Sequence, residues 1–313
     1  SDTGFVATGN EMILNTATGE EVRYAANDGV LGKMQPLTYS DKKVSQTTTL
    51  PYRLYLPENY DSSKKYPVLL YLHGAGERGS DNMAQVAGSN LGVTFPLKRI
   101  IFGSYRNDVI IVAPQCPLDK RWVETDWTPG GYKIDEVPQS VPSKLAASLL
   151  YNEIFQKYSV DLSRVYGAGI SMGGFGITDM AMRYPDLFAA IVNSAGGADS
   201  GEFALLSTTA LAGYNSNSDT TVGYEALAQL CGNMKDAGLD ARYTHVEDIG
   251  HLSWLVAYQD AELLHWLFSK TKKWTVKVNA FGGSLNGDIL ESFGIDQERV
   301  VLPDAYKEGL TFA

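Results

Sequence analysis

The sequence predicts an α/β fold, in which a mainly parallel β-sheet is covered by helices on both faces. Three observations support this prediction. Short apolar runs alternate with amphipathic helical patterns through the middle of the 313-residue chain, as is typical of strands that alternate with helices. With 44% apolar residues, a chain of this length can bury a large core without disulfides. In addition, a glycine-flanked serine stands between one apolar run and the helical pattern that follows it.

The apolar runs predict strands that are buried on both faces, because their side chains do not alternate with polar ones. These runs are Val68–Leu72, Val109–Ala113, Val165–Ala168, Ala189–Asn193 and Ala210–Gly213. Apolar residues at helical spacing predict helices near Leu145–Tyr158, Phe175–Arg183, Tyr224–Lys235 and Ala261–Lys270. An alternating pattern at Ala241–Val246 predicts one more strand. Ligands of such sheets bind at the carboxyl ends of the strands, so we expect functional residues just after each run.

Two flanking regions depart from this alternation. Residues 1–45 are polar and turn-rich, with alternating pieces such as Glu21–Ala25, and are expected to form short strands. Residues 275–313 are β-like and too short for a core of their own. The β-like pieces of this tail are Thr275–Val278, Val300–Pro303 and Gly309–Phe312. We therefore expect β-rich extensions over residues 1–45 and 275–313, around a central α/β domain over residues 46–274.

A long loop, Pro117–Ser143, separates the second apolar run from the next helical pattern and carries Trp122, Trp127 and Tyr132. Loops of this length inside a compact domain are usually functional. Its aromatic side chains offer stacking faces for sugar or phenolic rings. They could equally attach the loop to the core.

Composition and charge exclude several classes of function. The net charge of −10 repels phosphate backbones, so we expect no nucleic-acid partner. No apolar run reaches the roughly 18 residues of a membrane span. We also expect neither a metal nor a cofactor, because the sequence has no His-x-x-x-His or Cys-x-x-Cys pair and no phosphate-binding loop. The two cysteines are too few for a disulfide scaffold: Cys231 has the spacing of a core thiol, and Cys116 could be reduced or paired.

The segment Gly169–Gly174, with the sequence Gly-Ile-Ser-Met-Gly-Gly, predicts a nucleophile elbow around Ser171. In such a turn the serine hydroxyl stands clear of the sheet. A Cβ atom at the flanking position 169 or 173 would collide with neighbouring backbone, which explains both glycines. The motif alone is weak, and its place between a strand and a helix is what supports it. The other interpretation is a glycine-rich turn with an incidental serine.

A serine hydroxyl needs a base, and histidine has the suitable pKa. The chain has four histidines. His251 lies in a loop after the last strand and before the last helix, where the base of a nucleophile–acid–histidine order would fall. Of the other three, His245 lies in a strand pattern, His265 in a helix as a packed or surface residue, and His73 directly after the first strand.

The acid of such a triad must lie between Ser171 and His251, at the carboxyl end of a strand. Asp219 fits, because it follows the run Ala210–Gly213 in a polar loop. Asp199 is the rival candidate. Glu247 and Asp248 lie too close to the histidine in sequence to reach its far nitrogen easily.

A tetrahedral intermediate also needs donors for its oxyanion, and backbone N–H groups supply them without rearrangement. The first should be the N–H of Met172, at the start of the helix after the nucleophile. The second should come from the glycine-containing turn His73–Gly76, where we select the N–H of Ala75. For His73 itself we expect a structural role rather than a catalytic one.

The motifs together resemble the α/β-hydrolase branch that includes feruloyl and acetylxylan esterases, polyhydroxybutyrate depolymerases and predicted peptidases. The resemblance covers about residues 46–274. The matching segments are Leu50–Pro57, Tyr71–Gly79, Ala113–Pro117 with Trp122, Ser171–Gly176, and Gly250–His251 with Trp254. It implies an α/β-hydrolase fold with an esterase triad of Ser171, Asp219 and His251. It also implies that Trp122 lines the substrate cleft and that Trp254 packs beside the histidine loop as a second substrate-binding candidate, although a core aromatic is an equally good interpretation of Trp254.

One departure from the family pattern concerns the acid loop. The family has His-Gly at the place where this chain has Asn215 and Ser216. Because Val222 still follows Asp219 at the family's spacing, the assignment of the acid is kept.

The tail is similar to the start of a glycine-rich β repeat of bacterial surface proteins, on the segments Phe281–Ser284 and Lys307–Ala313. This similarity implies a piece of a longer modular protein, and the other interpretation is an extension packed on the central domain. Together with a start at Ser1 without Met or a signal-like stretch, it favours a secreted or cell-surface protein. A cytoplasmic origin of a trimmed chain is not excluded.

Three functions are compatible with these residues. The first is a serine carboxylic-ester hydrolase that removes acetyl or hydroxycinnamoyl groups from plant polysaccharide. The second is a serine peptidase that uses the same triad. The third is a non-catalytic carbohydrate-binding surface protein on a hydrolase scaffold, which would have no use for a strained nucleophile turn. The sequence therefore favours the esterase.

Overall fold

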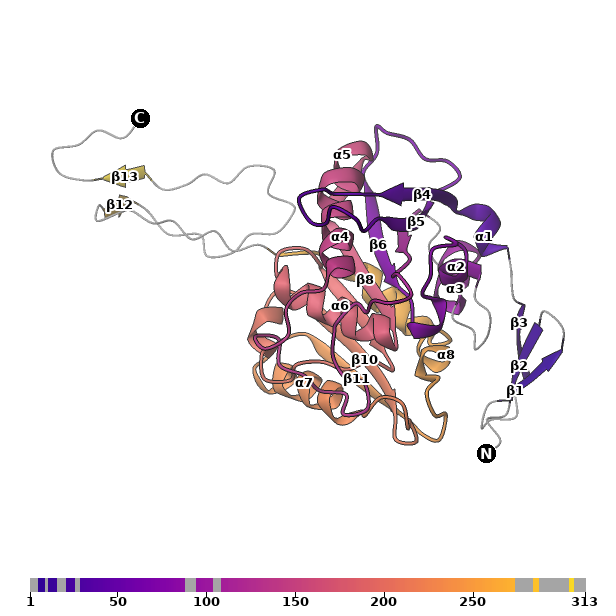
Figure 1. Ribbon diagram of the computed structural model, residues 1–313. Coiled ribbons are helices and arrows are strands. Elements are labelled where there is room, and N and C mark those ends of the chain that lie inside the picture. Colours follow the sequence, from indigo (N-terminus) through magenta and orange to yellow (C-terminus); the bar gives the residue numbers. More distant parts are fainter. Residues whose placement is uncertain are drawn as a thin grey trace.

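The computed structural model describes residues 29–87, 94–103 and 108–273, and the backbone of five short strands outside these ranges (Figure 1). Three of these strands form a small antiparallel sheet, and the other two pair with each other in antiparallel orientation. They are β1 (Phe5–Thr8), β2 (Glu11–Asn15), β3 (Glu21–Ala25), β12 (Ser284–Asn286) and β13 (Asp304–Tyr306). The expected strands at Thr275–Val278, Val300–Pro303 and Gly309–Phe312, and nearly all of the repeat-like tail, lie outside the described residues.

The centre of the molecule is an eight-stranded sheet with the order β11-β10-β9-β8-β6-β7-β5-β4. The six strands from β11 to β7 run parallel, while β5 is antiparallel to both of its neighbours. The bounds are β4 (Gln35–Tyr39), β5 (Leu50–Tyr55), β6 (Tyr66–Leu72), β7 (Ile110–Pro114), β8 (Val160–Ile170), β9 (Ala190–Ser194), β10 (Ala210–Ser216) and β11 (Ala241–Val246). The predicted α/β class with a mainly parallel sheet is therefore confirmed.

The ends of several strands differ from the prediction. Strand β10 continues to Ser216, whereas the apolar run ends at Gly213. The polar residues Asn215 and Ser216 remain in the sheet because their backbones pair with His245 and Val246 of β11. Strand β4 belongs to the main sheet, so this sheet begins before residue 46. In both cases hydrogen bonding to a neighbouring strand extends the sheet beyond the apolar pattern.

Helices cover both faces of the sheet. The bounds are α1 (Val30–Lys33), α2 (Ala84–Ala87), α3 (Phe95–Ile101), α4 (Val141–Leu149), α5 (Phe155–Lys157), α6 (Met172–Arg183), α7 (Glu225–Asp236), α8 (Ser253–Ala257) and α9 (Ala261–Ser269), with 3₁₀ turns η1 (Ala75–Glu77) and η3 (Phe203–Leu206) and a π-helical turn η2 (Leu150–Ile154). The predicted helix at Leu145–Tyr158 is the continuous run α4–η2–α5. It begins earlier than predicted because Ser140 caps it by accepting a hydrogen bond from Ser143 N–H.

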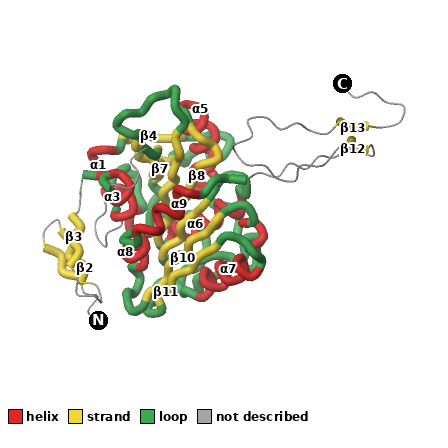
Figure 2. Tube along the Cα trace, turned by 180° about the vertical axis from the view of Figure 1, so that it is seen from behind, coloured by secondary structure: helices red, strands yellow, loops and turns green. Residues whose placement is uncertain are grey.

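The side chains of β6 illustrate how the sheet divides the core in two. Val68, Leu70 and Leu72 point to one face and belong to the cluster that includes residues of α4, α6 and α7. Leu69 and Tyr71 point to the other face and belong to the cluster that includes residues of α3, α8 and α9. Figure 1 shows the first group of helices in front of the sheet, and Figure 2 shows α8, α9 and α3 on the opposite side. Among the described residues, no helix is long and apolar enough to cross a membrane.

A buried lysine fastens the chain segment after α9 to the sheet. Lys272 is fully buried, and its ammonium donates to the Phe188 carbonyl (3.0 Å) and to both oxygens of Thr208 (2.9 and 3.1 Å). The Pro185 carbonyl and the Thr209 hydroxyl complete the shell. Burial lowers the pKa of Lys272 to about 8. Residues 185–188 precede β9 and residues 208–209 precede β10, so a single side chain connects three parts of the fold.

Candidate active site

Ser171 occupies a sharp turn between β8 and α6. Its backbone has φ 52° and ψ −122°, a strained conformation for a residue with a side chain. The Ser171 N–H donates to the Ser194 carbonyl at 2.8 Å, which ties the turn to the end of β9. A Cβ atom on Gly169 would collide with the Gly173 carbonyl, and one on Gly173 with the Leu72 carbonyl. The turn is therefore possible only with glycine at both positions, as expected of a nucleophile elbow.

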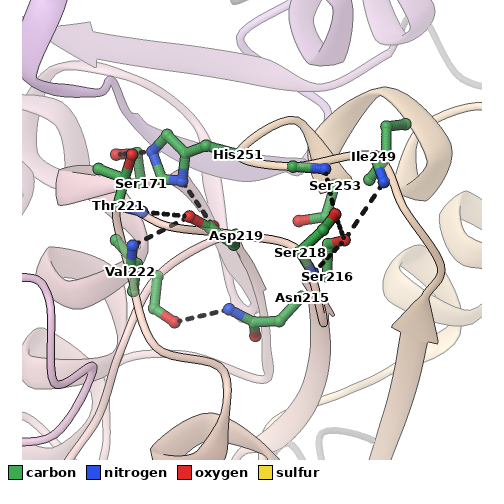
Figure 3. A network of polar contacts seen from close by, with 12 residues as sticks. Ser171, Asn215, Ser216, Ser218, Asp219, Thr221, Val222, Ile249, His251 and Ser253 are labelled. Atoms are coloured by element: carbon green, nitrogen blue, oxygen red, sulfur yellow. Dashed lines mark hydrogen bonds and ion pairs between the residues drawn. The ribbon is translucent and has the colours of Figure 1, made fainter. Parts of the chain in front are cut away.

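The structure brings the three predicted triad residues together (Figure 3). Ser171 Oγ lies 2.7 Å from His251 Nε2, and His251 Nδ1 lies 2.7 Å from Asp219 Oδ2. The Asp219 side chain is fully buried, while the His251 side chain is 22% exposed. The arrangement gives a hydroxyl, a base and a buried carboxylate in one continuous hydrogen-bonded chain, which is the geometry of an activated serine.

Backbone donors hold the carboxylate of Asp219 in place. Its second oxygen, Oδ1, accepts from the N–H groups of Thr221 (2.8 Å) and Val222 (3.0 Å). These bonds fix the rotation of the carboxylate, so that Oδ2 remains directed at the imidazole. Figure 3 shows the backbone nitrogens of Thr221 and Val222 to the left of Asp219 and the imidazole of His251 above it.

The departure from the family's His-Gly pattern is resolved by a polar network between the acid loop and the histidine loop. Asn215 is buried in the sheet and donates to the Gly196 carbonyl. After it, the side chains of three successive residues accept backbone N–H groups from the loop that carries His251 (Figure 3 shows two of the three). The pairs are Ser216 Oγ with Ile249 N–H (3.3 Å), Asn217 Oδ1 with Asp248 N–H (3.0 Å) and Ser218 Oγ with Gly250 N–H (2.9 Å). The acid and the base are thus carried on loops that are bonded to each other.

Both candidate oxyanion donors lie beside the nucleophile. Met172 is the first residue of α6, so its N–H has no partner within the helix. Ala75 opens η1, directly after Gly74. A methyl group built on Gly74 would lie 3.1 Å from Glu77 Oε2 and 3.5 Å from Ser171 Cβ, whereas one built on Gly76 would meet no atom within 4 Å. The turn is therefore packed against the nucleophile at position 74 and open at position 76.

His73 supports this turn from below. It is fully buried, its Nδ1 lies 2.6 Å from the Gly74 carbonyl, and its Nε2 accepts from Cys116 N–H at 2.9 Å. These partners require a neutral ring with the proton on Nδ1. Burial lowers the pKa of His73 to about 4, which keeps the ring neutral. None of the hydrogen bonds of the His73 side chain in the described residues goes to Ser171, Asp219 or His251, as expected for a structural role.

The two tryptophans proposed from the resemblance are both buried. Trp122 is fully buried, with its Nε1–H donating to the His73 carbonyl at 3.1 Å and its ring against the His73 imidazole. The expectation that Trp122 lines the cleft is corrected accordingly, because its ring is part of the support under the oxyanion turn. Trp254 is 2% exposed and contacts the His251 ring edge-on at 5.5 Å, so it is a core aromatic that packs against the base.

The remaining candidates have other partners. Asp199 is buried and accepts from Ile134 N–H (2.9 Å) and Gly201 N–H (3.0 Å), so the rival carboxylate attaches the long loop to the core. His245 lies on β11, with its Nε2 3.8 Å from Glu247 Oε1, and His265 lies exposed on α9. Both cysteines are free and buried, and burial raises the pKa of the Cys231 thiol to about 12 and that of Cys116 still further. In the described part of the chain, no cluster of His, Cys, Asp or Glu is arranged to hold a metal ion.

The long loop that carries Trp127 borders a pocket of about 580 Å³ next to the acid loop. Its lining residues are Arg121, Asp126, Trp127, Thr128, Pro129, Thr220 and Thr221. The guanidinium of Arg121 lies 4.5 Å from the centre of the Trp127 ring, and that of Arg78 lies 5.9 Å from it. Since Arg78 also donates to the Ala75 carbonyl (2.9 Å), this cluster connects the oxyanion turn with the pocket.

Helix α6 holds the far part of the same loop. Asp179 is buried, accepts from the Tyr132 hydroxyl (2.9 Å) and pairs with Arg183 (2.8 Å). Arg183 in turn donates to the carbonyls of Ile134 (3.2 Å) and Val137 (2.6 Å). Burial raises the pKa of Asp179, and the bond from Arg183 opposes that shift. The helix that begins at the nucleophile thereby also anchors the long loop.

Sequence reasoning missed one ionisable group at the site. Glu77 ends η1 and is only 5% exposed, although a glutamate directly after a glycine-rich turn is expected at the surface. Burial raises the pKa of Glu77 to about 7, against opposing backbone hydrogen bonds from Gly74 and Glu77 itself. The only feature of the sequence that points to Glu77 is its position directly after the oxyanion turn.

Comparisons with known proteins bear on the family and the fold of the chain. The Esterase family model, described as "Putative esterase", matches residues 45–203, just over half of the chain. No curated protein matches. Among solved structures, the chain is similar to a thermostable esterase, with 26% identity, a TM-score of 0.67 and coverage of 86% of this chain and 76% of the other. It shares the fold of a ferulic acid esterase (21% identity, TM-score 0.53, 75% and 99% covered) and of S-formylglutathione hydrolase from Staphylococcus aureus (13%, 0.51, 75% and 98%).

Proposed function

Because this chain belongs to the Esterase family and is therefore a carboxylic ester hydrolase, we propose that it cleaves its substrate through a covalent acyl-enzyme on Ser171. The observation that carries the proposal is the continuous hydrogen-bonded chain from Ser171 Oγ through His251 to Asp219, with both links at 2.7 Å. The strained turn and the two backbone N–H groups beside it support the same mechanism.

In the first half of the reaction, Ser171 Oγ attacks the carbonyl carbon of the ester while its proton passes to His251 Nε2. Asp219 holds the proton on Nδ1 and stabilises the imidazolium that forms. The carbonyl oxygen becomes an oxyanion and accepts hydrogen bonds from the N–H groups of Met172 and Ala75. Collapse of the intermediate breaks the bond to the alcohol oxygen, which takes its proton from His251.

The second half repeats these steps with water. His251 removes a proton from the water as its oxygen attacks the acyl carbon, and the same two N–H groups hold the second oxyanion. Breakage of the bond to Ser171 Oγ releases the acid, and the proton on His251 returns to the serine. No other group is required for the chemistry.

For the substrate, we propose esters in which plant polysaccharide carries acetyl or hydroxycinnamoyl groups. The pocket beside the acid loop supports this, because it combines an indole ring with hydroxyl, carboxylate and guanidinium groups that can bond sugar hydroxyls. The similarity in fold to a ferulic acid esterase points the same way. Such a substrate lies outside the cell, so we also propose that the protein is secreted or held on the cell surface.

Hydrolysis of p-nitrophenyl acetate by the wild type and by Ser171→Ala tests the mechanism. We expect the substitution to lower kcat by at least about 1,000-fold with an unchanged unfolding temperature. Equal rates in the two proteins would contradict the role of Ser171.

A panel of substrates then tests the specificity. It compares methyl ferulate, acetylated xylan and a peptide of mixed sequence. Preference for the first two is expected, while cleavage of the peptide alone would replace the esterase by a serine peptidase.

A further inference from the structure

The loop that carries His251 lies beyond the last backbone pairing of the sheet. Strand β10 ends at Ser216 and β11 ends at Val246, and these two residues pair with each other. His251 follows five residues after the end of β11. The position of the base therefore depends on the hydrogen bonds that hold the residues in between.

Side chains continue the connection where the backbone pairing ends. The N–H groups of residues 248, 249 and 250 donate to the side chains of Asn217 (3.0 Å), Ser216 (3.3 Å) and Ser218 (2.9 Å), in that order. Asn217 Nδ2 in addition donates to Glu247 Oε2 at 2.7 Å. Three successive peptide groups ahead of the base are thus bonded to three successive side chains at the end of β10.

The loop has two residues with positive φ angles. Asp248 has φ 50°, which is unfavourable for a residue with a side chain, and Gly250 has φ 61°. A methyl group built on Gly250 would meet no atom within 4 Å, so packing does not confine the chain on that side. A strained conformation persists only where its surroundings fix it, and at Asp248 the hydrogen bond from its N–H to Asn217 is such a constraint.

Ser218 and Gly250 each stand directly before a member of the triad. Ser218 precedes the acid Asp219, and Gly250 precedes the base His251. The 2.9 Å bond between Ser218 and Gly250 therefore joins the two loops one residue away from the 2.7 Å bond between the acid and the base. Figure 3 shows Ser218 to the right of Asp219 and below the loop that carries His251.

We propose that Ser218, together with Asn217, is a positioning residue of the triad, which holds the histidine loop so that His251 stays in line between Asp219 and Ser171. The inference rests on the proposed acyl-enzyme mechanism. Both residues act through the backbone of the loop. A displaced imidazole accepts the serine proton less efficiently while the substrate still binds, so loss of these bonds lowers kcat and leaves KM nearly unchanged.

Three variants separate this role from a general contribution to stability. Asn217 and Ser218 are exposed, so their truncation to alanine leaves no cavity. With p-nitrophenyl acetate, Ser218→Ala should lower kcat by about 10-fold and the double variant Asn217→Ala/Ser218→Ala by about 100-fold, with KM within about threefold of the wild type. Ser218→Thr keeps the hydroxyl that accepts the Gly250 N–H and should retain kcat within about threefold. The unfolding temperature of each variant shows that it is folded in the assay.

Ser45→Ala is the matched control. Ser45 Oγ likewise accepts a backbone N–H, that of Thr48 at 3.0 Å, but it lies between β4 and β5, at the opposite edge of the sheet from β10 and β11. Its loss should leave kcat unchanged. Full kcat in Ser218→Ala, or an equal loss in Ser218→Thr, would overturn the role of Ser218. A wild type without esterase activity, or a Ser171→Ala variant as active as the wild type, would instead contradict the proposed function itself.

Discussion

The two carboxylate oxygens of Asp219 have different partners, and the substitution Asp219→Asn distinguishes their contributions. Oδ2 receives the histidine, while Oδ1 receives the N–H groups of Thr221 and Val222. In Asp219→Asn the amide keeps one acceptor, which the loop can use, but the charge that stabilises the imidazolium is lost. We expect kcat to fall by about 1,000- to 10,000-fold with little change in KM.

Asp199, the other candidate for the acid of the triad, provides the control for this prediction. Asp199→Asn should weaken the attachment of the long loop at Ile134 and lower the unfolding temperature, because that is where its carboxylate bonds. Steady-state kinetics with p-nitrophenyl acetate decide between the two. A larger loss of kcat in Asp199→Asn than in Asp219→Asn would show that the acid is misassigned.

Glu77 also makes the stability of the protein depend on pH. Burial raises its pKa in the folded protein from 4.5 to about 7, so the folded state binds the proton more tightly than the unfolded chain does. The contribution to stability is therefore complete below pH 4.5 and is lost as the pH rises through 7. Relative to Glu77→Gln, the wild type should lose about 2.5 kcal/mol of unfolding free energy between pH 5 and pH 8. Urea denaturation of both proteins at the two pH values measures this difference, and a constant difference would be evidence against a buried, titrating Glu77.

At the residue scale, the sequence predicted the catalytic side chains that follow the end of a strand. Ser171, Asp219 and His251 could be found because each follows a strand, and strand ends meet at one edge of a parallel sheet. The burial of Glu77 and Trp122 could not be found in this way. It depends on what lies beneath the oxyanion turn, which is decided by contacts between residues far apart in the chain.

At the scale of elements, α6 serves both the nucleophile and the long loop. Arg183→Ala would leave the buried Asp179 with only the Tyr132 hydroxyl, and would free the carbonyls of Ile134 and Val137. We expect a loss of about 3 kcal/mol of unfolding free energy, typical of a buried ion pair that loses one partner. Limited proteolysis should then cut within residues 117–143 faster than in the wild type. An unchanged cleavage rate would mean that other contacts hold the loop.

Element positions were predicted well where apolar residues fill a whole strand or one face of a helix, as in β6 and α7. The misplaced ends have local causes. Strand β10 runs into polar residues because β11 pairs with them, and α4 begins early because Ser140 caps it and Pro142 stands in its first turn. The sequence did not predict that β4 belongs to the main sheet. An edge strand needs only one apolar face and therefore lacks the continuous apolar run of the central strands.

At the scale of the whole molecule, the main sheet, both core clusters and the candidate site all lie within residues 29–273. A chain limited to these residues should fold and hydrolyse p-nitrophenyl acetate at the full rate. A chain limited to residues 29–271 lacks Lys272 and so loses the ammonium that donates to oxygens of Pro185, Phe188, Thr208 and Thr209. We expect it to be less stable by at least about 3 kcal/mol. Thermal unfolding of the two chains, which differ by two residues, measures the effect. Equal unfolding temperatures would show that Lys272 does not stabilise the fold.

The contrast between Gly74 and Gly76 has a consequence for directed evolution of this enzyme. In a saturation library at position 74, small residues should be selected, because a Cβ atom there already lies 3.1 Å from the carboxylate of Glu77 and in contact with Cβ of Ser171. At position 76 a new side chain enters open space beside the oxyanion donor. Libraries at position 76 can therefore change which acyl groups are accepted while the catalytic machinery stays intact.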